Sequence, residues 1–167
     1  KHIPINQLRD VWSIVKYNDS KYLLSSYSTG LFNLEAGKDK YNIKKIDGNF
    51  NDYYYRSTID DEKNIYLTNT TGLYKYKKSD LSKRETIKLN SSILVSKFDR
   101  KRKTLIAGGH KGLFLIKENS EIEKIDFSSI SKSYVLSIDF WKDKYYLGSA
   151  SNLIEYSPED KSYRKIR

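Results

Sequence analysis

A run of three tyrosines followed by an arginine is the part of the sequence whose chemistry most clearly favours ligand binding. Side chains along an extended strand point alternately to opposite faces, so Tyr53, Tyr54 and Tyr55 cannot all enter one core. Aromatic rings beside a guanidinium such as that of Arg56 are the groups that contact sugar rings and their carboxylates. The run therefore predicts a carbohydrate-binding surface. The alternative is that these tyrosines fill the space between packed sheets.

Three more residues complete the set of candidate ligand contacts: Asn69, His110 and Lys111. His2 and His110 are the only histidines of a chain without cysteine, and their spacing matches no metal-binding motif. The sequence also has no Gly-x-Ser-x-Gly motif and no glycine-rich phosphate-binding loop. We therefore expect no metal, no cofactor and no catalytic residue, and we expect that the chain is not an enzyme.

The elements that must position these residues follow from a fourfold repeat. Gly30, Gly72, Gly112 and Asn152 each follow a similar extended run and precede a leucine, at intervals of roughly 40 residues. Gly and Asn are the residue types that best tolerate a positive φ, so each of them predicts a tight turn between two strands.

Each repeat divides into four short runs rich in β-branched and aromatic residues, and only Ser79–Arg84 could form a single helical turn. Four strands in a repeat of about 40 residues are typical of β-propeller blades. We predict an all-β chain with four four-stranded antiparallel blades, as one propeller domain or propeller fragment over residues 1–167. The blades are expected at about 8–48, 49–90, 91–127 and 128–167. The chain is then either a fragment of a larger propeller or a small closed ring.

Propeller topology collects the turns between second and third strands and the blade-to-blade connections on one face. All the candidate ligand contacts fall in such segments. Most aspartates fall instead between first and second strands, where Asp bonds to its own turn, and a glycosidase would need two carboxylates facing each other across a cleft. The carboxylates considered are Asp19, Asp60, Asp61, Asp99, Asp139 and Asp143, and we interpret most of them as turn residues.

The repeat resembles that of the two-component-regulator propeller family. Tyr66–Leu73 and Tyr146–Leu153 are similar to the family's second-strand motif, Trp-Ile-Gly-Thr-x-x-Gly-Leu, and Leu8–Ile14 resembles its first strand. Tyrosine or aliphatic residues replace the motif tryptophan. The resemblance covers essentially the whole chain. It implies the sensor region, periplasmic or otherwise extracytoplasmic, of a hybrid two-component regulator, whose propellers usually have seven blades. It implies that the remaining blades, or a second chain, complete the propeller.

Composition limits the partners. The 167 residues carry 31 Lys and Arg against 21 Asp and Glu, a net charge of +10 that favours acidic ligands, so the expected oligosaccharide could be acidic. The compact run Arg100–Lys103 has no interleaved aromatic residue, and nucleic acid is not an expected partner. No apolar stretch is long enough for membrane insertion. The alternative function is a protein–protein interaction scaffold without a small-molecule ligand.

Overall fold

The computed structural model describes residues 8, 10–27, 29–38, 40–47, 56–60, 63–129 and 134–166. Within these residues the chain forms strands throughout, with no helix, and none of its segments is a helix long and apolar enough to cross a membrane. The strands are β1 (Val11–Lys16), β2 (Lys21–Ser26), β3 (Gly30–Ala36), β4 (Tyr41–Asp47), β5 (Ser57–Ile59), β6 (Asn64–Thr68), β7 (Gly72–Lys77), β8 (Asp80–Lys88), β9 (Ile93–Asp99), β10 (Thr104–Gly109), β11 (Gly112–Lys117), β12 (Ile122–Ile125), β13 (Ser137–Trp141), β14 (Lys144–Gly148), β15 (Leu153–Ser157) and β16 (Ser162–Ile166).

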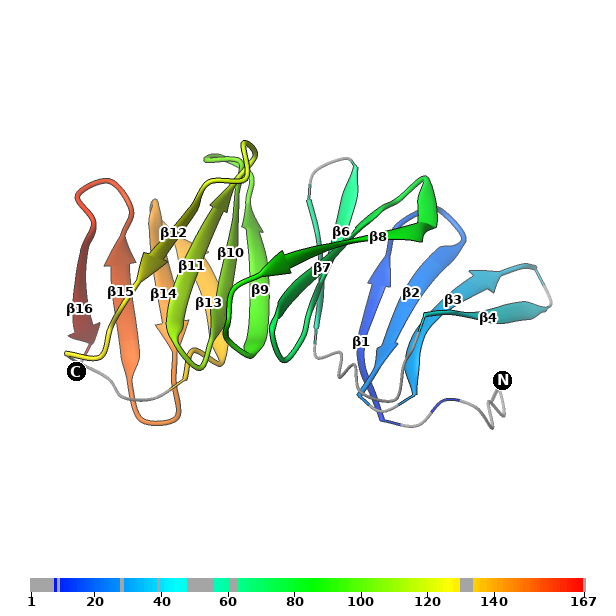
Figure 1. Ribbon diagram of the computed structural model, residues 1–167, viewed down its shortest axis with the longest axis horizontal. Helices are drawn as coiled ribbons and strands as arrows, with labels where there is room; N and C mark the ends of the chain where they lie inside the picture. The colour runs from blue at the N-terminus through cyan, green and yellow to red at the C-terminus, as the bar shows by residue number, and fades with distance from the viewer. Residues whose placement is uncertain are drawn as a thin grey trace.

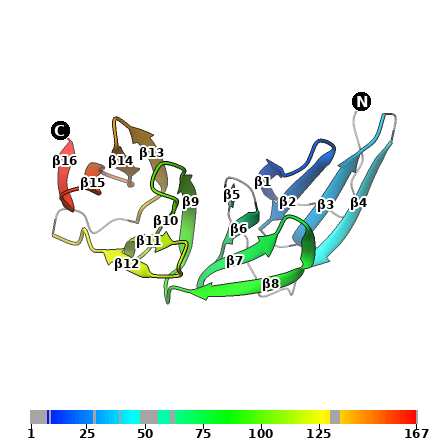
Figure 2. The same ribbon diagram turned by 90° about the horizontal axis from the view of Figure 1, so that it is seen from above.

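The strands form four separate four-stranded sheets, each an antiparallel meander of strands consecutive in sequence. We number these sheets blades 1 to 4, from β1–β4 to β13–β16. The first strand of each blade lies nearest the concave side, and β1, β5, β9 and β13 contact one another in that order. The predicted all-β fold of four antiparallel propeller blades is confirmed. The blades form an open arc (Figure 2), so the alternative of a closed four-bladed ring is wrong.

Three apolar clusters hold the arc together, one between each pair of successive blades. Strand alternation divides the side chains between them, because neighbouring residues on a strand point to opposite faces. In β7, Leu73 is buried against blade 3, whereas Tyr74 and Tyr76 are buried against blade 1. Between blades 3 and 4, the core is built around Ile106 and Tyr145. Each blade therefore uses both of its faces for packing wherever it has a neighbour.

Glycine is required at the turns predicted from the repeat. Gly30 and Gly112 have φ values of 105° and 104°, which side chains with a Cβ rarely adopt. A Cβ on Gly112 would also lie 2.5 Å from the carbonyl oxygen of Ile125. Asn152 differs from the expectation, because its φ is not positive. Its turn is instead fixed by Ser149, whose Oγ accepts a hydrogen bond of 3.0 Å from the backbone N–H of Asn152.

Two predicted segments differ in the structure. The segment considered for a helical turn, Ser79–Arg84, is mostly part of β8, because Glu85 pairs with Lys75 across the strands and the Arg84 guanidinium lies 4.2 Å from the centre of the Tyr74 ring. The run Tyr134–Phe140 predicts the first strand of the last blade, and in the structure that strand begins at Ser137. The residues before it connect two blades, and the N–H of Leu136 donates to the carbonyl oxygen of Gly148.

The propeller arc has two faces (Figure 1). The lower face carries the turns between second and third strands and the blade-to-blade connections, and the upper face carries the other two sets of turns. Asp60 and Asp99 lie in upper-face turns and act there as predicted. The Asp60 carboxylate accepts from the backbone N–H groups of Lys63 and Asn64, and Asp99 accepts from that of Arg102.

Candidate ligand-binding face

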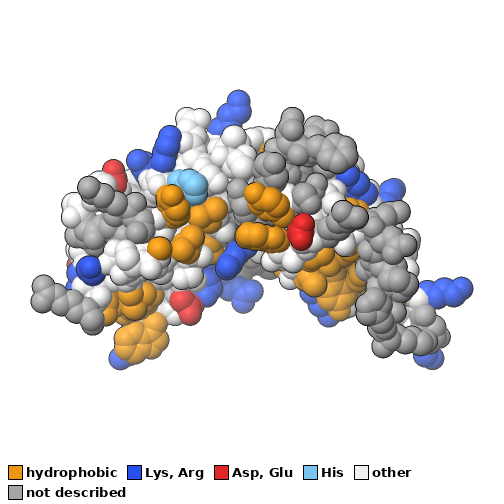
Figure 3. All heavy atoms as spheres, turned by 90° about the horizontal axis from the view of Figure 1, so that it is seen from below, with side chains coloured by type: hydrophobic (Ala, Val, Ile, Leu, Met, Phe, Trp, Pro, Cys, Tyr) orange, Lys and Arg blue, Asp and Glu red, His pale blue; other side chains and the backbone are white. Residues whose placement is uncertain are grey.

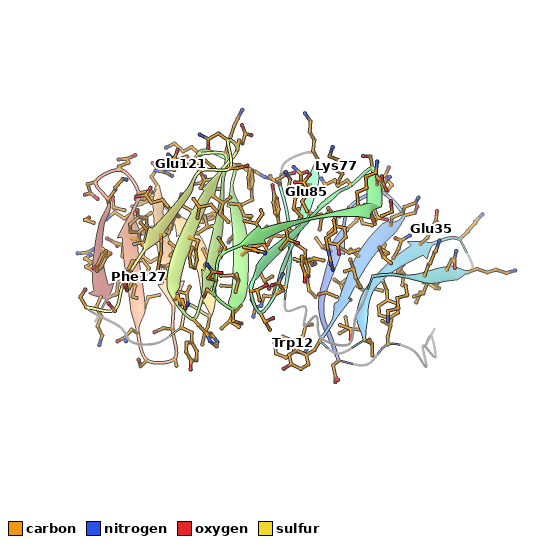
Figure 4. The ribbon with its side chains drawn as sticks, viewed as in Figure 1. Trp12, Glu35, Lys77, Glu85, Glu121 and Phe127 are labelled. Atoms are coloured by element: carbon orange, nitrogen blue, oxygen red, sulfur yellow. The ribbon has the colours of Figure 1, made fainter. Side chains whose placement is uncertain are left out.

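Two stacked aromatic pairs stand on the lower face. Trp12 and Tyr27 stack with ring centroids 5.4 Å apart, and His110 and Tyr134 stack at 4.1 Å. The outer ring of each pair stays accessible, since Trp12 is 56% exposed and Tyr134 is 48% exposed. Trp12 projects at the lower edge of the molecule (Figure 4), and the view of the lower face shows hydrophobic side chains beside the histidine (Figure 3).

The first pair is positioned by an irregularity in β1. The pairing of β1 with β2 shifts register between Val11 and Ser13, so that Trp12 stands at a bulge. The backbone N–H of Tyr27 donates to the carbonyl oxygen of Asp10 at 3.0 Å. This bond brings the end of β2 beside the start of β1 and places the two rings in contact.

The second pair is positioned by the packing of blade 3 against blade 4. The N–H of Val135 donates to the carbonyl oxygen of Gly109 at 3.1 Å, so the connection into blade 4 runs along the β10–β11 turn. In that turn the N–H of His110 donates to the carbonyl oxygen of Ser92, and the N–H of Lys111 donates to the Oγ of Ser91. The exposed His110 side chain stacks on the Tyr134 ring, and Lys111, the next residue of the turn, is also exposed.

The structure places the other predicted contacts in different surroundings. Tyr53, Tyr54 and Tyr55 lie outside the described residues. Arg56 is exposed and follows them directly, and its backbone N–H is bound to Thr68 Oγ1.

Asn69 is buried, and its side chain shapes the β6–β7 turn. Its Oδ1 accepts from the backbone N–H groups of Thr71 and Gly72 at 2.7 and 2.9 Å, and also from the Thr71 hydroxyl. An Asn side chain that bonds to the backbone two or three residues on is a turn-forming arrangement. The geometry therefore brings His110 together with Tyr134 and leaves Lys111 exposed in the same turn, while Asn69 shapes the β6–β7 turn.

A groove of about 520 Å³ opens on the upper face between blades 2 and 3, and the sequence analysis did not foresee it. Its floor includes Phe98, Leu105 and Ile116, and four lysines line it. Lys75 pairs with Glu85, and Lys117 pairs with Glu121. The groove's other lysines are Lys63 and Lys103. In the sequence, the feature that points to this groove is the presence of lysines in the upper-face turns of successive blades. By itself this feature is typical of solvated hairpin ends.

The basic run Arg100–Lys103 borders this groove, and part of its charge is used within the protein. Lys101 lies 2.6 Å from Asp143, and Arg102 lies 3.2 Å from Asp99. Burial favours a higher pKa for the Asp99 carboxyl, but hydrogen bonds from the Tyr145 hydroxyl and the backbone of Arg102 outweigh it and hold the pKa below its usual range. These contacts give the run a role in joining blades 3 and 4. Within the described part of the chain, no group of three or more His, Asp or Glu side chains could hold a metal ion.

Comparisons with known proteins identify the fold. No protein-family profile matches the sequence, and no curated protein matches it. Solved structures do. The extracellular domain described as that of a hybrid two-component system, BT4673 from B. thetaiotaomicron, matches with a TM-score of 0.76 and 16% identity over 93% of this chain and 22% of that one. The corresponding domain of BT3049 from the same organism matches with a TM-score of 0.74 and 20% identity over 96% of this chain and 22% of that one. The WD40 β-propeller domain of Doa1 matches with a TM-score of 0.67 and 15% identity over 95% of this chain and 54% of that one.

The chain has a β-propeller fold. It spans about a fifth of the length of the two extracellular domains. At these identities the likeness extends to the fold alone.

Proposed function

We propose that this propeller arc is the ligand-binding part of an extracytoplasmic sensor of the hybrid two-component type, not an enzyme, and that its ligand is an oligosaccharide. The observation that carries the proposal is the pair of half-exposed aromatic rings on the lower face, Trp12 and Tyr134, each supported from behind by a second ring. Supported, exposed aromatic rings are rigid surfaces on which the apolar faces of sugars stack.

Polar groups around these rings supply hydrogen bonds and positive charge. His110 stacks on Tyr134, Lys111 is exposed next to His110 in the same turn, and Arg56 is exposed on the same face. A guanidinium and an ammonium both favour carboxylates, and the net charge of +10 attracts anions over longer distances. An acidic oligosaccharide is therefore expected to bind more tightly than a neutral one of equal length, and Tyr53, Tyr54 and Tyr55 would extend the same surface.

Calorimetric titration with a galacturonic acid tetramer and a neutral glucose tetramer tests the proposal. Trp12→Ala and Tyr134→Ala should each weaken binding by about tenfold, equivalent to about 1.4 kcal/mol. Trp141→Ala is the matched control, because Trp141 is equally exposed but stands beside an upper-face turn, and its affinity should be unchanged.

The titrations distinguish an error in the position of the binding site from a failure of the carbohydrate proposal itself. If Lys63→Ala or Lys103→Ala weakens binding while the two lower-face variants do not, the oligosaccharide binds in the upper-face groove and our site is wrong. If neither tetramer binds, the carbohydrate proposal fails.

The second candidate function is a protein–protein scaffold. It is favoured by the exposed apolar side chains next to the aromatic pairs, Val11 and Leu136, because neighbouring apolar groups on a surface are typical of protein contacts. Retention of a protein partner by the wild-type chain but not by Leu136→Lys, with no affinity for either tetramer, would favour this function.

A further inference from the structure

The upper-face groove between blades 2 and 3 is open because blade 3 presents a shorter side chain there than blade 4 presents to blade 3. Leu105 and Tyr145 are equivalent residues, since each is the second residue of its blade's second strand and each pairs with a phenylalanine of the first strand. The Tyr145 hydroxyl reaches across to the Asp99 carboxylate of blade 3 at 2.7 Å. Leu105 cannot reach blade 2 in this way. The groove therefore measures about 520 Å³, whereas the cavity between blades 3 and 4 at the same end measures about 180 Å³.

Blade 2 leaves the space open from the other side. Lys75 stands three residues after Gly72, in the position that Leu115 has three residues after Gly112. Leu115 is buried in the apolar cluster between blades 3 and 4, whereas Lys75 lines the groove and pairs with Glu85 on β8 (Figure 4). An ammonium group stays hydrated, so a lysine does not close an apolar contact in the way that a leucine does.

Part of the apolar cluster between blades 2 and 3 opens into this groove. The partly buried members of the cluster are Ile87 and Phe98, and both line the groove together with Tyr66. The volume lies within the range of about 300–1,000 Å³ that is typical of small-molecule sites. The groove therefore offers an apolar surface to the body of a small ligand.

The lining of the groove also carries an excess of positive charge. It contains four lysines and two carboxylates, Asp60 and Glu118. Two of the lysines, Lys63 of blade 2 and Lys103 of blade 3, come from equivalent turns between first and second strands, and both are exposed. Among the residues that the structure describes, neither of these two lysines forms an ion pair. Two unpaired ammonium groups that line one groove attract an anion.

We propose that this groove binds a small amphiphilic anion. Its apolar body would contact Ile87 and Phe98, and its carboxylate, sulfate or phosphate group would bond to Lys63 and Lys103. The unpaired lysines select the negative charge, and the apolar wall selects the body. The limited volume favours a free molecule over a membrane surface. The site is separate from the proposed oligosaccharide surface, because the aromatic pairs stand on the opposite face of the arc.

Calorimetric titration of the chain with three probes tests the choice of ligand. Naphthalene-2-sulfonate has an apolar body and a negative charge, naphthalene-2-sulfonamide has the same body without the charge, and inorganic sulfate has the charge without the body. The sulfonate should bind about tenfold more tightly than the sulfonamide, because its charge meets two ammonium groups. At the same ionic strength, sulfate should show no measurable binding.

Variants of the groove test its position. Lys63→Ala and Lys103→Ala should each weaken sulfonate binding by about fivefold. Lys165→Ala is the matched control, because Lys165 is an exposed lysine on β16, and this variant should bind as the wild type does. Leu105→Tyr gives blade 3 the side chain that blade 4 has at this position, so it should fill the groove and abolish binding. Circular dichroism checks that each variant folds, and the lysine variants test the groove independently of Leu105→Tyr.

Three results would overturn the proposal. Equal affinities for the sulfonate and the sulfonamide would show that the groove does not select an anion. Unchanged affinity in both Lys63→Ala and Lys103→Ala, with loss of binding in Trp12→Ala or Tyr134→Ala, would place the probe on the lower face. Binding of phosphatidylglycerol vesicles by the wild type but not by Leu105→Tyr would show that the groove takes a lipid instead of a free molecule. None of these results depends on whether the lower face binds an oligosaccharide.

Discussion

At the scale of single residues, polar side chains in this propeller act mainly by joining one blade to the next. Thr58 Oγ1 of blade 2 donates to the carbonyl oxygen of Ser96 in blade 3, and Lys97 of blade 3 pairs with Asp139 of blade 4. The most buried of these links is the hydrogen bond of 2.7 Å from the Tyr145 hydroxyl to the Asp99 carboxylate. Because burial and the Asp99 charge both raise the pKa of Tyr145, this hydroxyl remains a donor at every physiological pH.

Tyr145→Phe should lower the free energy of unfolding by about 1–3 kcal/mol, because it leaves a buried carboxylate short of a donor. Urea denaturation of the variant and the wild type measures this change. The control is Tyr163→Phe, which removes an exposed hydroxyl contact to Ser129 and should cost clearly less. Equal losses in the two variants would mean that the bond to Asp99 contributes nothing beyond an exposed contact.

At the scale of elements, each blade depends on its neighbours for burial. A four-stranded sheet has two faces, and the middle strands of blades 2 and 3 bury apolar residues on both of them. In β10, Leu105 and Ala107 pack against blade 2, whereas Ile106 packs against blade 4. The stability of the arc is therefore expected to come from the contacts between blades, as in other repeat proteins.

Ile106→Ala should lower the free energy of unfolding by about 2–5 kcal/mol, because Ile106 is fully buried between blades 3 and 4 and its removal leaves a cavity. Ile122→Ala removes the same atoms from a side chain that is largely exposed, so its effect should be small. Thermal and urea unfolding of both variants provide the comparison. A loss below about 1 kcal/mol for Ile106→Ala would contradict tight packing between the two blades.

At the scale of the whole molecule, the arc combines a strongly basic surface with local acidic groups that are held ionised. Hydrogen bonds from Lys144 and Arg164 lower the pKa of Glu155 to about 2, and those from Ser157 and Ser162 lower the pKa of Asp160 to about 2. Both residues belong to blade 4.

The pH dependence of stability follows from the sign of these shifts. The pKa of Glu155 is lower in the folded protein than its ordinary value of 4.5, so the unfolded chain takes up a proton first as the pH falls. The stabilisation of the folded state by ionised Glu155 is complete above about pH 4.5 and is lost as the pH falls toward about 2. Glu155→Gln should lower the urea midpoint at neutral pH and reduce the loss of stability over this acidic range. An acid-unfolding curve of unchanged shape would show that the ion pairs of Glu155 do not couple to folding.

The sequence determined the fold class because the information is local and repeated. A positive-φ turn needs glycine, so Gly30 and Gly112 mark hairpins that are visible without coordinates. Runs of β-branched and aromatic residues between polar turns specify strands, and a fourfold recurrence of about 40 residues specifies blades. Asp60 and Asp99 were predicted as turn residues for the same reason, because their hydrogen bonds reach only three or four residues along the chain.

Only the tertiary structure decided which side of a strand faces which neighbour. Alignment on the turn glycine matches Leu24 with Tyr66, but the β2–β3 pairing is offset by one residue, and Leu23 is the residue that packs against blade 2. A one-residue offset exchanges the two faces of a strand. The stacking of His110 on Tyr134 and the groove between blades 2 and 3 likewise join residues of different turns or blades, so their formation depends on how the blades pack and not on local sequence.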